Sequence, residues 1–262
     1  ARAARDRRRS RPRAGVRLVT LGGFAVHRDG RPLPDSAFGR QKARALLAML
    51  ACARGAVHRE ALVDGLWPDL SAKRGLAALN STLYALRRGL EPELAAGDSS
   101  SLVVAEGPTY RLVLGEADSW DAADFLARAR AALAAPGDVD ALLAAEAAWT
   151  GPFLPEWTFA PWTEPLRTEL GEAHRAVLVG AAEALAAAGR AEEAISRYRL
   201  LLAMEPEREG WHRALMRVYA RAGERGLALR QFEACRRALR EGLGVEPSRE
   251  TRDLHAELLR EG

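Results

Sequence analysis

The sequence has 262 residues, of which 48% are hydrophobic and 28% are charged, with a net charge of +4 at pH 7. This balance is typical of a soluble globular protein long enough for two compact domains, and it argues against a disordered chain. No apolar run approaches about eighteen residues, and the Arg-rich start has no apolar segment behind it, so we predict neither a membrane span nor a secretory signal. Cys52 and Cys235 fall in apolar helical patterns, which favours a reducing cytoplasm over a disulfide or a metal pair.

The positive charge is concentrated at the N-terminal end. Residues 1–15 carry a net charge of +6, residues 16–115 carry +4, and the remaining residues carry −6. A basic half joined to an acidic half is expected when only the first half meets nucleic acid. Because residues 1–14 hold no apolar side chain larger than alanine, we predict that residues 1–15 form a basic, disordered tail or linker. The start at Ala1 rather than Met indicates a trimmed chain or part of a longer one.

Residues 16–115 predict a small sheet, three helices and a final hairpin. Short β-prone runs cover 16–21 and 24–27, and the turn signal Asp29-Gly30 leads into 31–33. Helical periodicity follows over 38–53, 59–66 and 71–90, where Ser71 is a plausible N-cap. Two further β runs, 102–105 and 110–114, are joined at Gly107-Pro108.

The third predicted helix has two contrasting faces. One stripe consists of leucines at steps of three and four, which predicts a buried face: Leu76, Leu79, Leu83, Leu86 and Leu90. The opposite face carries small side chains between arginines and no acid: Arg74, Ala77, Ser81, Tyr84, Ala85 and Arg88. Such a surface suits a major groove, where bulk prevents close approach and acids repel phosphate. An ordinary amphipathic helix with a solvated basic face is the alternative interpretation.

The order of these elements resembles a winged helix-turn-helix of the OmpR type. Four segments carry the resemblance: 39–47 (GRQKARALL), 59–67 (REALVDGLW), 83–90 (LYALRRGL) and 110–112 (YRL). The resemblance implies that the third helix reads DNA and that the last hairpin is the wing. The wing departs from the family pattern, because Gly107-Pro108-Thr109-Tyr110 stands where a Gly-Tyr step is usual.

Beyond Gly115 the pattern is helical to the end of the chain. Two helices are predicted at 118–135 and 138–149, and the breaker-rich, aromatic segment 150–157 with Trp162 is expected to pack across these helices or against the first domain. A 34-residue repeat then relates three pairs of positions: Gly189 and Gly223, Ala194 and Ala228, Tyr198 and Phe232. The repeat predicts tetratricopeptide-like helix pairs, with an insertion around 242–244. A generic array of helical hairpins is the alternative.

Residues 116–262 resemble the bacterial transcriptional activation domain. The matching segments are 149–154 (WTGPFL), Trp162 with 164–167 (EPLR), and 243–248 (LGVEPS). With the winged helix, the resemblance covers residues 16–260 and implies a regulator of the SARP type or the C-terminal part of a larger ATPase-containing regulator. The predicted fold is an α+β winged helix (residues 16–115) followed by an all-α, tetratricopeptide-like domain (residues 116–262).

Sequence patterns for catalysis are missing. The two lysines, Lys42 and Lys73, are followed by Ala43 and Arg74 rather than by Ser or Thr, which excludes a phosphate loop of the Walker type. The five histidines lie in different predicted elements without a paired metal-ligand spacing. We therefore predict no enzyme, no cofactor, no metal site and no catalytic residue.

The leading hypothesis is a sequence-specific transcriptional activator. The candidate DNA-binding residues are cations, hydroxyls and one aromatic side chain: Lys42, Arg44, Lys73, Arg74, Ser81, Thr82, Tyr84, Arg87, Arg88 and Thr109. The resemblance implies homodimers on direct repeats of promoter DNA, recruitment of RNA polymerase through its sigma or alpha subunit, and a place in the cytoplasm with the nucleoid. The alternatives are a protein-interaction adaptor that works through the helical repeats, and the DNA-binding output module of a ligand-gated ATPase switch.

Overall fold

The computed structural model describes residues 15–39, 41–95 and 97–260, which divide into two compact units. The first unit contains the described residues up to Asp124 together with 150–170, and the second contains 125–149 and the residues from Gly171 on. The chain therefore passes between the units three times. The basic tail predicted for residues 1–15 falls, apart from Gly15, outside the described residues.

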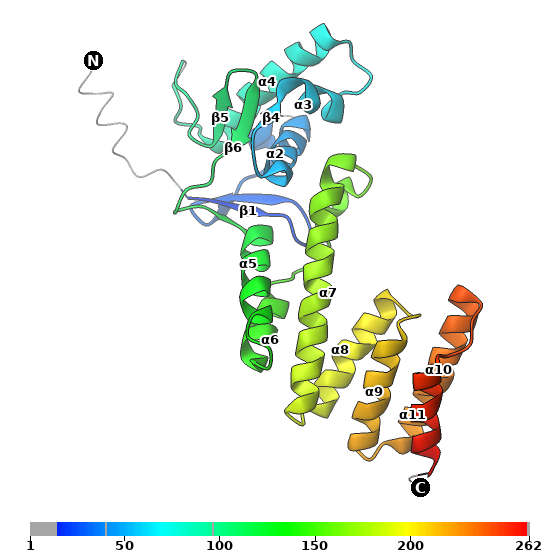
Figure 1. Cartoon of the computed structure of the whole chain (residues 1–262). Coiled ribbons are helices and arrows are strands. Elements are labelled where there is room, and N and C mark those ends of the chain that lie inside the picture. The colour runs from blue at the N-terminus through cyan, green and yellow to red at the C-terminus, as the bar shows by residue number, and fades with distance from the viewer. Residues whose placement is uncertain (1–14, 40, 96, 261–262) are drawn as a thin grey trace. The chain divides into compact units, whose positions relative to one another are not determined.

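The first unit begins with a sheet to which a distant strand is added. Strands β1 (Val16–Val19), β2 (Ala25–Arg28) and β3 (Arg31–Pro32) pair antiparallel, and β7 (Ser119–Trp120) pairs parallel to β1 (Figure 1). The turn between β2 and β3 places Asp29 and Gly30 at positive φ, as the sequence signal predicts. Strand β7 was not predicted, and the helix expected from residue 118 begins at Asp121 instead. The two-residue β7 is too short to produce an alternating pattern.

The carboxylate of Asp121 fixes the end of β1. It accepts hydrogen bonds from the backbone N of Thr20 at 2.8 Å, the hydroxyl of Thr20 at 2.7 Å and the backbone N of Leu21 at 2.9 Å. The indole Nε1 of Trp120 donates to the hydroxyl oxygen of Thr20 at 2.9 Å. Because Thr20 is fully buried, these bonds replace water for groups that would otherwise be unsatisfied.

The segment 150–170 packs against this same sheet, which decides between the two placements expected for it. The backbone N of Leu154 donates to the carbonyl of Thr20 at 2.8 Å, and Leu21 forms a β-bridge with Phe153. The segment continues through the short helices η2 (Pro155–Trp157) and η3 (Pro161–Thr163) into the first turns of α7 (Glu164–Ala187). The prediction that this aromatic segment packs is confirmed at Phe153, which is buried in the core.

Three helices and a second sheet complete the first unit as a winged helix-turn-helix. The elements are η1 (Asp35–Phe38), α2 (Gln41–Ala53), β4 (Val57–His58), α3 (Arg59–Leu66), α4 (Ala72–Leu90), β5 (Val103–Glu106) and β6 (Thr109–Leu112). Figure 1 shows α2, α3 and α4 grouped beside strands β4 to β6, whose order is β4-β6-β5. The helices predicted at 59–66 and 71–90 are confirmed. The first helix starts later than predicted, because Phe38 belongs to a 3-10 turn that Gly39 ends at φ 63°.

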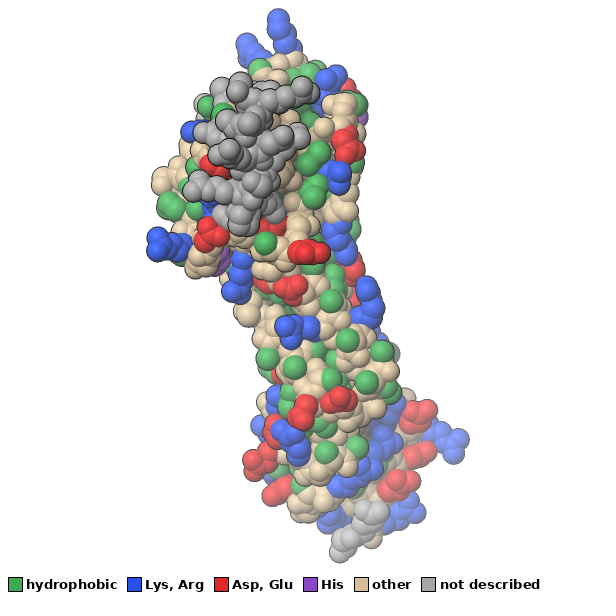
Figure 2. Space-filling view, turned by 90° about the vertical axis from the view of Figure 1, so that its left-hand side faces the viewer, with side chains coloured by type: hydrophobic (Ala, Val, Ile, Leu, Met, Phe, Trp, Pro, Cys, Tyr) green, Lys and Arg blue, Asp and Glu red, His purple; other side chains and the backbone are tan. Residues whose placement is uncertain are grey.

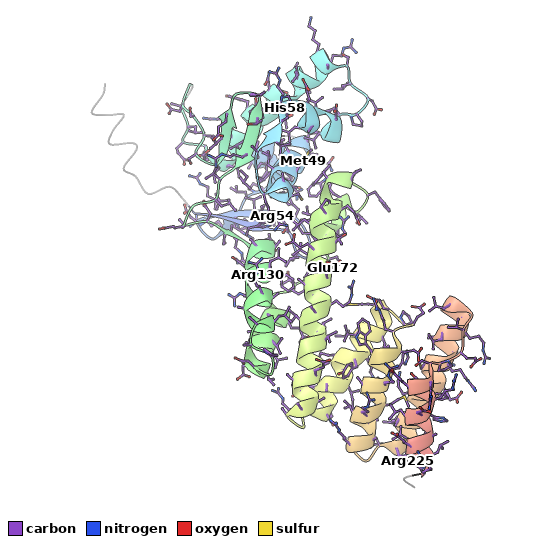
Figure 3. The ribbon with its side chains drawn as sticks, in the orientation of Figure 1. Met49, Arg54, His58, Arg130, Glu172 and Arg225 are labelled. Carbon is purple, nitrogen blue, oxygen red and sulfur yellow. The ribbon has the colours of Figure 1, made fainter. Side chains whose placement is uncertain are left out.

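Close contacts at two glycines join the three helices, Gly75 between α4 and α3 and Gly65 between α3 and α2. A Cβ atom at Gly75, the fourth residue of α4, would lie 2.3 Å from Cγ1 of Val63 in α3. A Cβ atom at Gly65 would lie 2.7 Å from Cε of Met49, which is labelled in Figure 3. Val63 is β-branched and buried, so it has little freedom to move away.

We therefore expect Gly75→Ala to destabilise the first unit by about 1–3 kcal/mol through overpacking, although alanine favours helix by about 1 kcal/mol. Gly210→Ala in α9 (Glu209–Arg221) is the matched control, because a Cβ atom there meets nothing within 4 Å. The control should be neutral or stabilising. Urea unfolding followed by tryptophan fluorescence measures both changes, and equal effects of the two substitutions would refute the packing argument.

The second unit is an array of antiparallel helices: the remainder of α5 (Asp121–Leu133), α6 (Val139–Ala147), the remainder of α7, α8 (Ala191–Met204), α9, α10 (Arg225–Leu243) and α11 (Arg249–Arg260) (Figure 1). The 34-residue repeat is confirmed as a structural repeat. Ala194 and Ala228 are fully buried at equivalent positions of α8 and α10, and the aromatic rings of Tyr198 and Phe232 are buried one turn later. Small residues at these positions allow the helices to approach closely.

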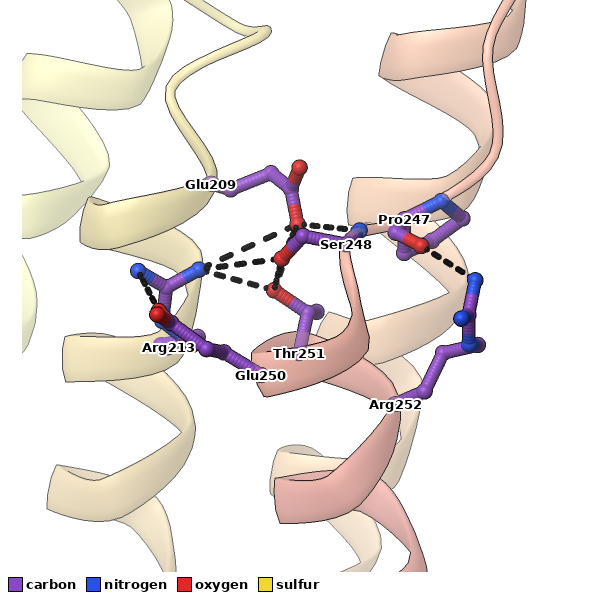
Figure 4. Close-up of polar contacts among 7 residues, drawn as sticks. All are labelled: Glu209, Arg213, Pro247, Ser248, Glu250, Thr251 and Arg252. Atoms are coloured by element: carbon purple, nitrogen blue, oxygen red, sulfur yellow. Dashed lines mark hydrogen bonds and ion pairs between the residues drawn. The ribbon is translucent and has the colours of Figure 1, made fainter.

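A polar cluster accommodates the insertion in the last repeat. Helix α10 ends at Gly244, with φ 69°, and the chain then turns into α11. The carboxylate of Glu209 in α9 accepts hydrogen bonds from the backbone and hydroxyl of Ser248, at 2.9 and 2.8 Å, and from the hydroxyl of Thr251 (Figure 4). Burial opposes the charge of Glu209, but these hydrogen bonds and the nearby Arg213 outweigh it, and the pKa of Glu209 lies below its ordinary value.

A stacked aromatic pair lies near the start of the second unit. The imidazole of His174 stacks on the indole of Trp149, with ring centroids 4.3 Å apart, and Phe125 borders both rings. Burial lowers the pKa of His174 to about 4, because desolvation disfavours the charged imidazolium. His174 is therefore neutral in the folded protein at neutral pH.

We predict that the second unit loses stability as the pH falls below about 6.5, the ordinary pKa of histidine. Between about pH 6.5 and pH 4, His174 is protonated in the unfolded chain but neutral in the folded protein. Buried His212, whose pKa is also lowered by burial, acts in the same direction. Urea unfolding midpoints at pH 7.5 and 5 test this: His174→Gln should reduce the difference, whereas His58→Gln, at an exposed position of the first unit, should not.

Candidate nucleic-acid interface

Helix α4 is the centre of the candidate interface. Its inner stripe is buried at Leu79, Leu83, Leu86 and Leu90, as predicted, whereas Leu76 is half-buried rather than buried. Ser71 stands at the N-cap position with extended backbone angles, but its side chain makes no capping hydrogen bond. The leucine stripe fixes the rotation of α4 about its own axis, and so determines which residues point outward.

The opposite stripe is exposed along the whole helix, and we call it the α4 outer face: Lys73, Arg74, Ala77, Asn80, Ser81, Tyr84 and Arg88. At 100° per residue these seven side chains fall within about one third of the circumference of the helix. Tyr84 stands out from this face, 69% exposed. The face is narrow, basic and free of acids, as the proposed entry into a groove requires.

The acid that directly follows α4 points into the protein. Glu91, which ends α4, is 5% exposed, and its carboxylate accepts hydrogen bonds from the hydroxyl groups of Ser100 and Ser101 and from the backbone N of Ser101. These bonds tie the end of α4 to the segment that enters β5. The carboxylate therefore does not oppose the positive charge of the α4 outer face.

Lys73 and Arg74 carry the charge at the start of α4. Both side chains are exposed, and within the described part of the chain neither forms an ion pair. Ser81 is exposed and its hydroxyl donates to the carbonyl of Ala78 at 2.9 Å, leaving its oxygen free to accept. Arg88 is exposed, but one of its guanidinium nitrogens donates to the carbonyl of Leu94 at 2.8 Å.

Four further predicted contact residues also have partners inside the protein. The amine of Lys42 donates to the carbonyl of Leu66 at 2.6 Å. The guanidinium of Arg44 forms an ion pair with Asp35 and donates to the carbonyl of Phe24, and that of Arg87 donates twice to the carbonyl of Val103. Thr82 is buried, and its hydroxyl donates to the carbonyl of Ala78. These four side chains hold the winged helix together in this conformation, and we leave them out of the proposed base-reading surface.

The wing is short and carries charges of both signs. Strands β5 and β6 are joined at Gly107, which has φ 58°, and Thr109 donates through its hydroxyl to the carbonyl of Glu106. Arg111 forms an ion pair with Glu106 at 2.8 Å, which offsets an acid that would repel phosphate. Pairing of β4 with β6 connects the wing to the start of α3, where the backbone N of Arg59 donates to the carbonyl of Pro108.

Two residues that the sequence analysis did not select join this surface. Asn80 lies halfway along the α4 outer face, at one edge of it, and its position could have been derived from the helical period alone. Arg59 is exposed beside the wing turn. No local pattern marks Arg59, because its place depends on the pairing of β4 with β6 across about fifty residues of sequence.

The second unit presents a different surface. On the face shown in Figure 2, Arg side chains alternate with Asp and Glu side chains over its helices. The second unit contains many ion pairs, such as Arg190 with Glu193 at 2.6 Å and Arg175 with Glu205 at 2.7 Å. Alternating charges do not create the single-sign field that attracts a polyanion.

Among the described residues, no three His, Cys, Asp or Glu side chains come together as a possible metal site. Burial raises the pKa of Cys52 and of Cys235 to about 12, so neither thiol is a nucleophile at neutral pH. In the same part of the chain, no helix is both long and apolar enough to cross a bilayer.

The sequence of the second half decides the family. The profile of the bacterial transcriptional activator domain matches residues 117–259. The chain belongs to this family.

The similarity of the chain to known regulators extends beyond this domain. The transcriptional regulatory protein MoaR1 of Mycobacterium tuberculosis is 31% identical over 253 residues, which are 94% of this chain and 80% of MoaR1. The regulatory protein AfsR of Streptomyces coelicolor is 31% identical over 252 residues, but these are 24% of AfsR. The structure of Mycobacterium tuberculosis EmbR, solved with a low-affinity phosphopeptide, matches 95% of this chain and 66% of that chain, with a TM-score of 0.79 and 28% identity. The chain is thus a SARP-type transcriptional regulator with a winged helix and a helical activator domain.

Proposed function

We propose that the chain binds specific double-stranded promoter sequences through its winged helix, residues 16–115, with α4 in the major groove. The observation that carries this proposal is the α4 outer face, which is exposed, basic, narrow and without an acid over the whole length of the helix. Arg74, Asn80 and Ser81 would reach base edges, while Lys73 and Arg59 would neutralise phosphates. Tyr84, Arg88 and Thr109 lie at the margins of this contact.

The helical part, residues 116–262, then supplies contacts to other proteins. In this proposal two copies bind side by side on direct repeats, and the complex recruits RNA polymerase through its sigma or alpha subunit, in the cytoplasm and on the nucleoid. The support is the kinship with MoaR1 and AfsR, whose names describe regulators, and the mixed-charge surface of the second unit, which suits a protein better than a polyanion.

A second candidate is the output module of a larger switch. Its specific support is AfsR, of which this chain matches 24%, so that a similar chain occurs inside a much longer regulator. DNA binding through α4 is common to both candidates. An adaptor that works through the helical repeats alone would give the α4 outer face no role.

Selection of bound sequences from random double-stranded DNA, followed by titration at several salt concentrations, tests the proposal. We expect a defined sequence to be enriched, and its affinity to fall steeply as salt rises, because phosphate contacts release counterions. Binding that is weak and indifferent to sequence would contradict the proposal and favour the adaptor. Leu83→Ala serves as a folding control, since loss of this buried side chain costs about 2–5 kcal/mol and imitates a binding defect.

A further inference from the structure

A pocket opens on the second unit between α6, α7 and α8. Its volume is about 460 Å³, which falls within the roughly 300–1,000 Å³ typical of sites for small organic molecules. All three helices supply apolar side chains to its walls: Leu143 and Ala147 from α6, Leu178 from α7, Leu200 and Met204 from α8. We call this the Trp149 pocket, after the indole that lies among these side chains.

A stack of two flat rings forms one wall of the Trp149 pocket. The planes of the His174 imidazole and the Trp149 indole are 10° apart, and both residues line the pocket. Both are half-buried, so the stack keeps some exposed surface. Because His174 is neutral at neutral pH, this wall consists of two uncharged aromatic rings. Such a wall favours a flat aromatic ligand, which can pack against it by offset stacking or by edge-to-face contact.

Two large apolar side chains stand at the mouth of the pocket. Leu200 and Met204 are 47% and 49% exposed, and they lie about one turn apart on α8. A ligand that covers them removes apolar surface from water, which is favourable. The unbranched side chain of methionine also adapts readily to the shape of what it covers.

The two charged side chains of the pocket neutralise each other. Nε of Arg197 donates to Oε2 of Glu146 at 3.1 Å, and about one fifth of each side chain is exposed, 19% and 20%. An ionic ligand would lose its hydration here without meeting an unpaired opposite charge, which is costly. The pocket therefore favours an uncharged ligand.

The same ion pair offers a hydrogen-bond donor beside an acceptor. Within the described part of the chain, Oε1 of Glu146 accepts no hydrogen bond and Nη2 of Arg197 donates none. The matching ligand edge carries an N–H group for the carboxylate next to a C=O group for the guanidinium. A lactam or a primary carboxamide on an aromatic ring has this edge and carries no charge.

We propose that the Trp149 pocket binds a small, uncharged, flat aromatic molecule with a lactam or carboxamide edge. The ring packs against the stack of Trp149 and His174, and the polar edge meets the ion pair of Glu146 and Arg197. The pocket shares no residue with the α4 outer face, so the proposal stands independently of the proposed DNA binding.

Titration with quinolin-2-one, a neutral bicyclic lactam, tests the proposal by heteronuclear NMR. We expect the indole N–H signal of Trp149 to shift, with a dissociation constant on the order of 0.1–1 mM for a probe of this size. Two other probes test the polar edge on the same wild-type protein. Binding of 1-methylquinolin-2-one, which has no N–H group, should be at least about fivefold weaker, and that of anionic naphthalene-2-carboxylate at least about tenfold weaker.

A pair of substitutions in α6 tests the place of binding. Ala147 is exposed on the pocket wall, so Ala147→Trp should fill the pocket and weaken quinolin-2-one binding at least about tenfold. Ala144→Trp, at an exposed position of the same helix that does not line the pocket, should bind like the wild type. Equal unfolding midpoints of the two variants would show that the substitution at the wall leaves the fold intact.

Three results would overturn the proposal. The first is a wild-type Trp149 signal that does not respond to 5 mM quinolin-2-one. The second is naphthalene-2-carboxylate that binds as tightly as the lactam, and the third is a folded Ala147→Trp variant that binds like Ala144→Trp. The probe comparisons require only the wild type, so they decide the matter even if Ala147→Trp does not fold. A failure of DNA selection would contradict the proposed function alone.

Discussion

Asp121→Asn is expected to lower the free energy of unfolding of the first unit by about 3 kcal/mol. The carboxylate accepts three hydrogen bonds from Thr20 and Leu21. In asparagine an NH₂ group replaces one carboxylate oxygen, and because NH₂ is itself a donor it cannot accept these hydrogen bonds. The hydroxyl oxygen of Thr20 also accepts a hydrogen bond from the indole of Trp120. The loss of stability therefore extends to the pairing of β1 with β7. Urea unfolding followed by the fluorescence of the tryptophans measures this change.

Asp124→Asn on the same helix provides the control for this prediction, because Asp124 is exposed. It should shift the unfolding midpoint little, since surface substitutions usually change stability by less than about 0.5 kcal/mol. Hydrogen exchange of the amides of Thr20 and Leu21 should accelerate in Asp121→Asn, while exchange in the second unit stays unchanged. Equal midpoints for the two variants would show that Asp121 does not hold β1.

The double substitution Lys73→Glu with Arg74→Glu is expected to weaken binding of the selected DNA by at least about 100-fold. Two cations at the start of α4 become two anions beside phosphate, and a base contact of Arg74, worth about 1–3 kcal/mol, is lost as well. Folding should be unaffected, because both side chains are exposed. Fluorescence anisotropy with labelled DNA measures the affinity, and the dependence of the affinity on salt should become shallower.

Arg217→Glu with Arg221→Glu in the second unit is the matched control, since it changes the net charge equally at two exposed arginines of α9. We expect less than a fewfold loss of affinity from it, because long-range repulsion is screened beyond about 10 Å at 0.1 M salt. If both double variants weaken binding equally, net charge rather than the α4 outer face explains the binding.

Local patterns were sufficient to predict α4 and the helical repeat. The spacing of the leucines correctly predicted that four of the five are buried in the core and that Arg74, Ser81 and Tyr84 are exposed. Both predictions follow from the 3.6 residues per turn of an α-helix. The 34-residue offset identified Ala194 and Ala228 as equivalent for the same reason: each repeat packs chiefly on its neighbours.

Interactions between residues far apart in the sequence could not be predicted in this way. Strand β7 and the return of 150–170 to the first sheet depend on Asp121 and Phe153 meeting Thr20 and Leu21, more than 99 residues away. Nothing in a local pattern specifies such a partner.

The same limit applies to the candidate site. The sequence cannot distinguish an arginine that binds phosphate from one that binds a carbonyl of its own chain. Arg44 and Arg87 have internal partners, whereas Arg74 forms no ion pair within the described residues. Charge and spacing are alike in the three cases, and only the tertiary contacts separate them.

A DNA-cleaving chelate attached at residue 81 tests the central claim most directly. Cys52 and Cys235 are the only cysteines of the chain, and their pKa values, raised to about 12, keep them unreactive at neutral pH. A thiol introduced by Ser81→Cys on the α4 outer face can therefore be labelled selectively, and Ser196→Cys, exposed on α8, is the matched control. We predict cleavage within the selected site from position 81 and none there from position 196. Cleavage no stronger from position 81 than from position 196 would contradict the entry of α4 into the DNA groove.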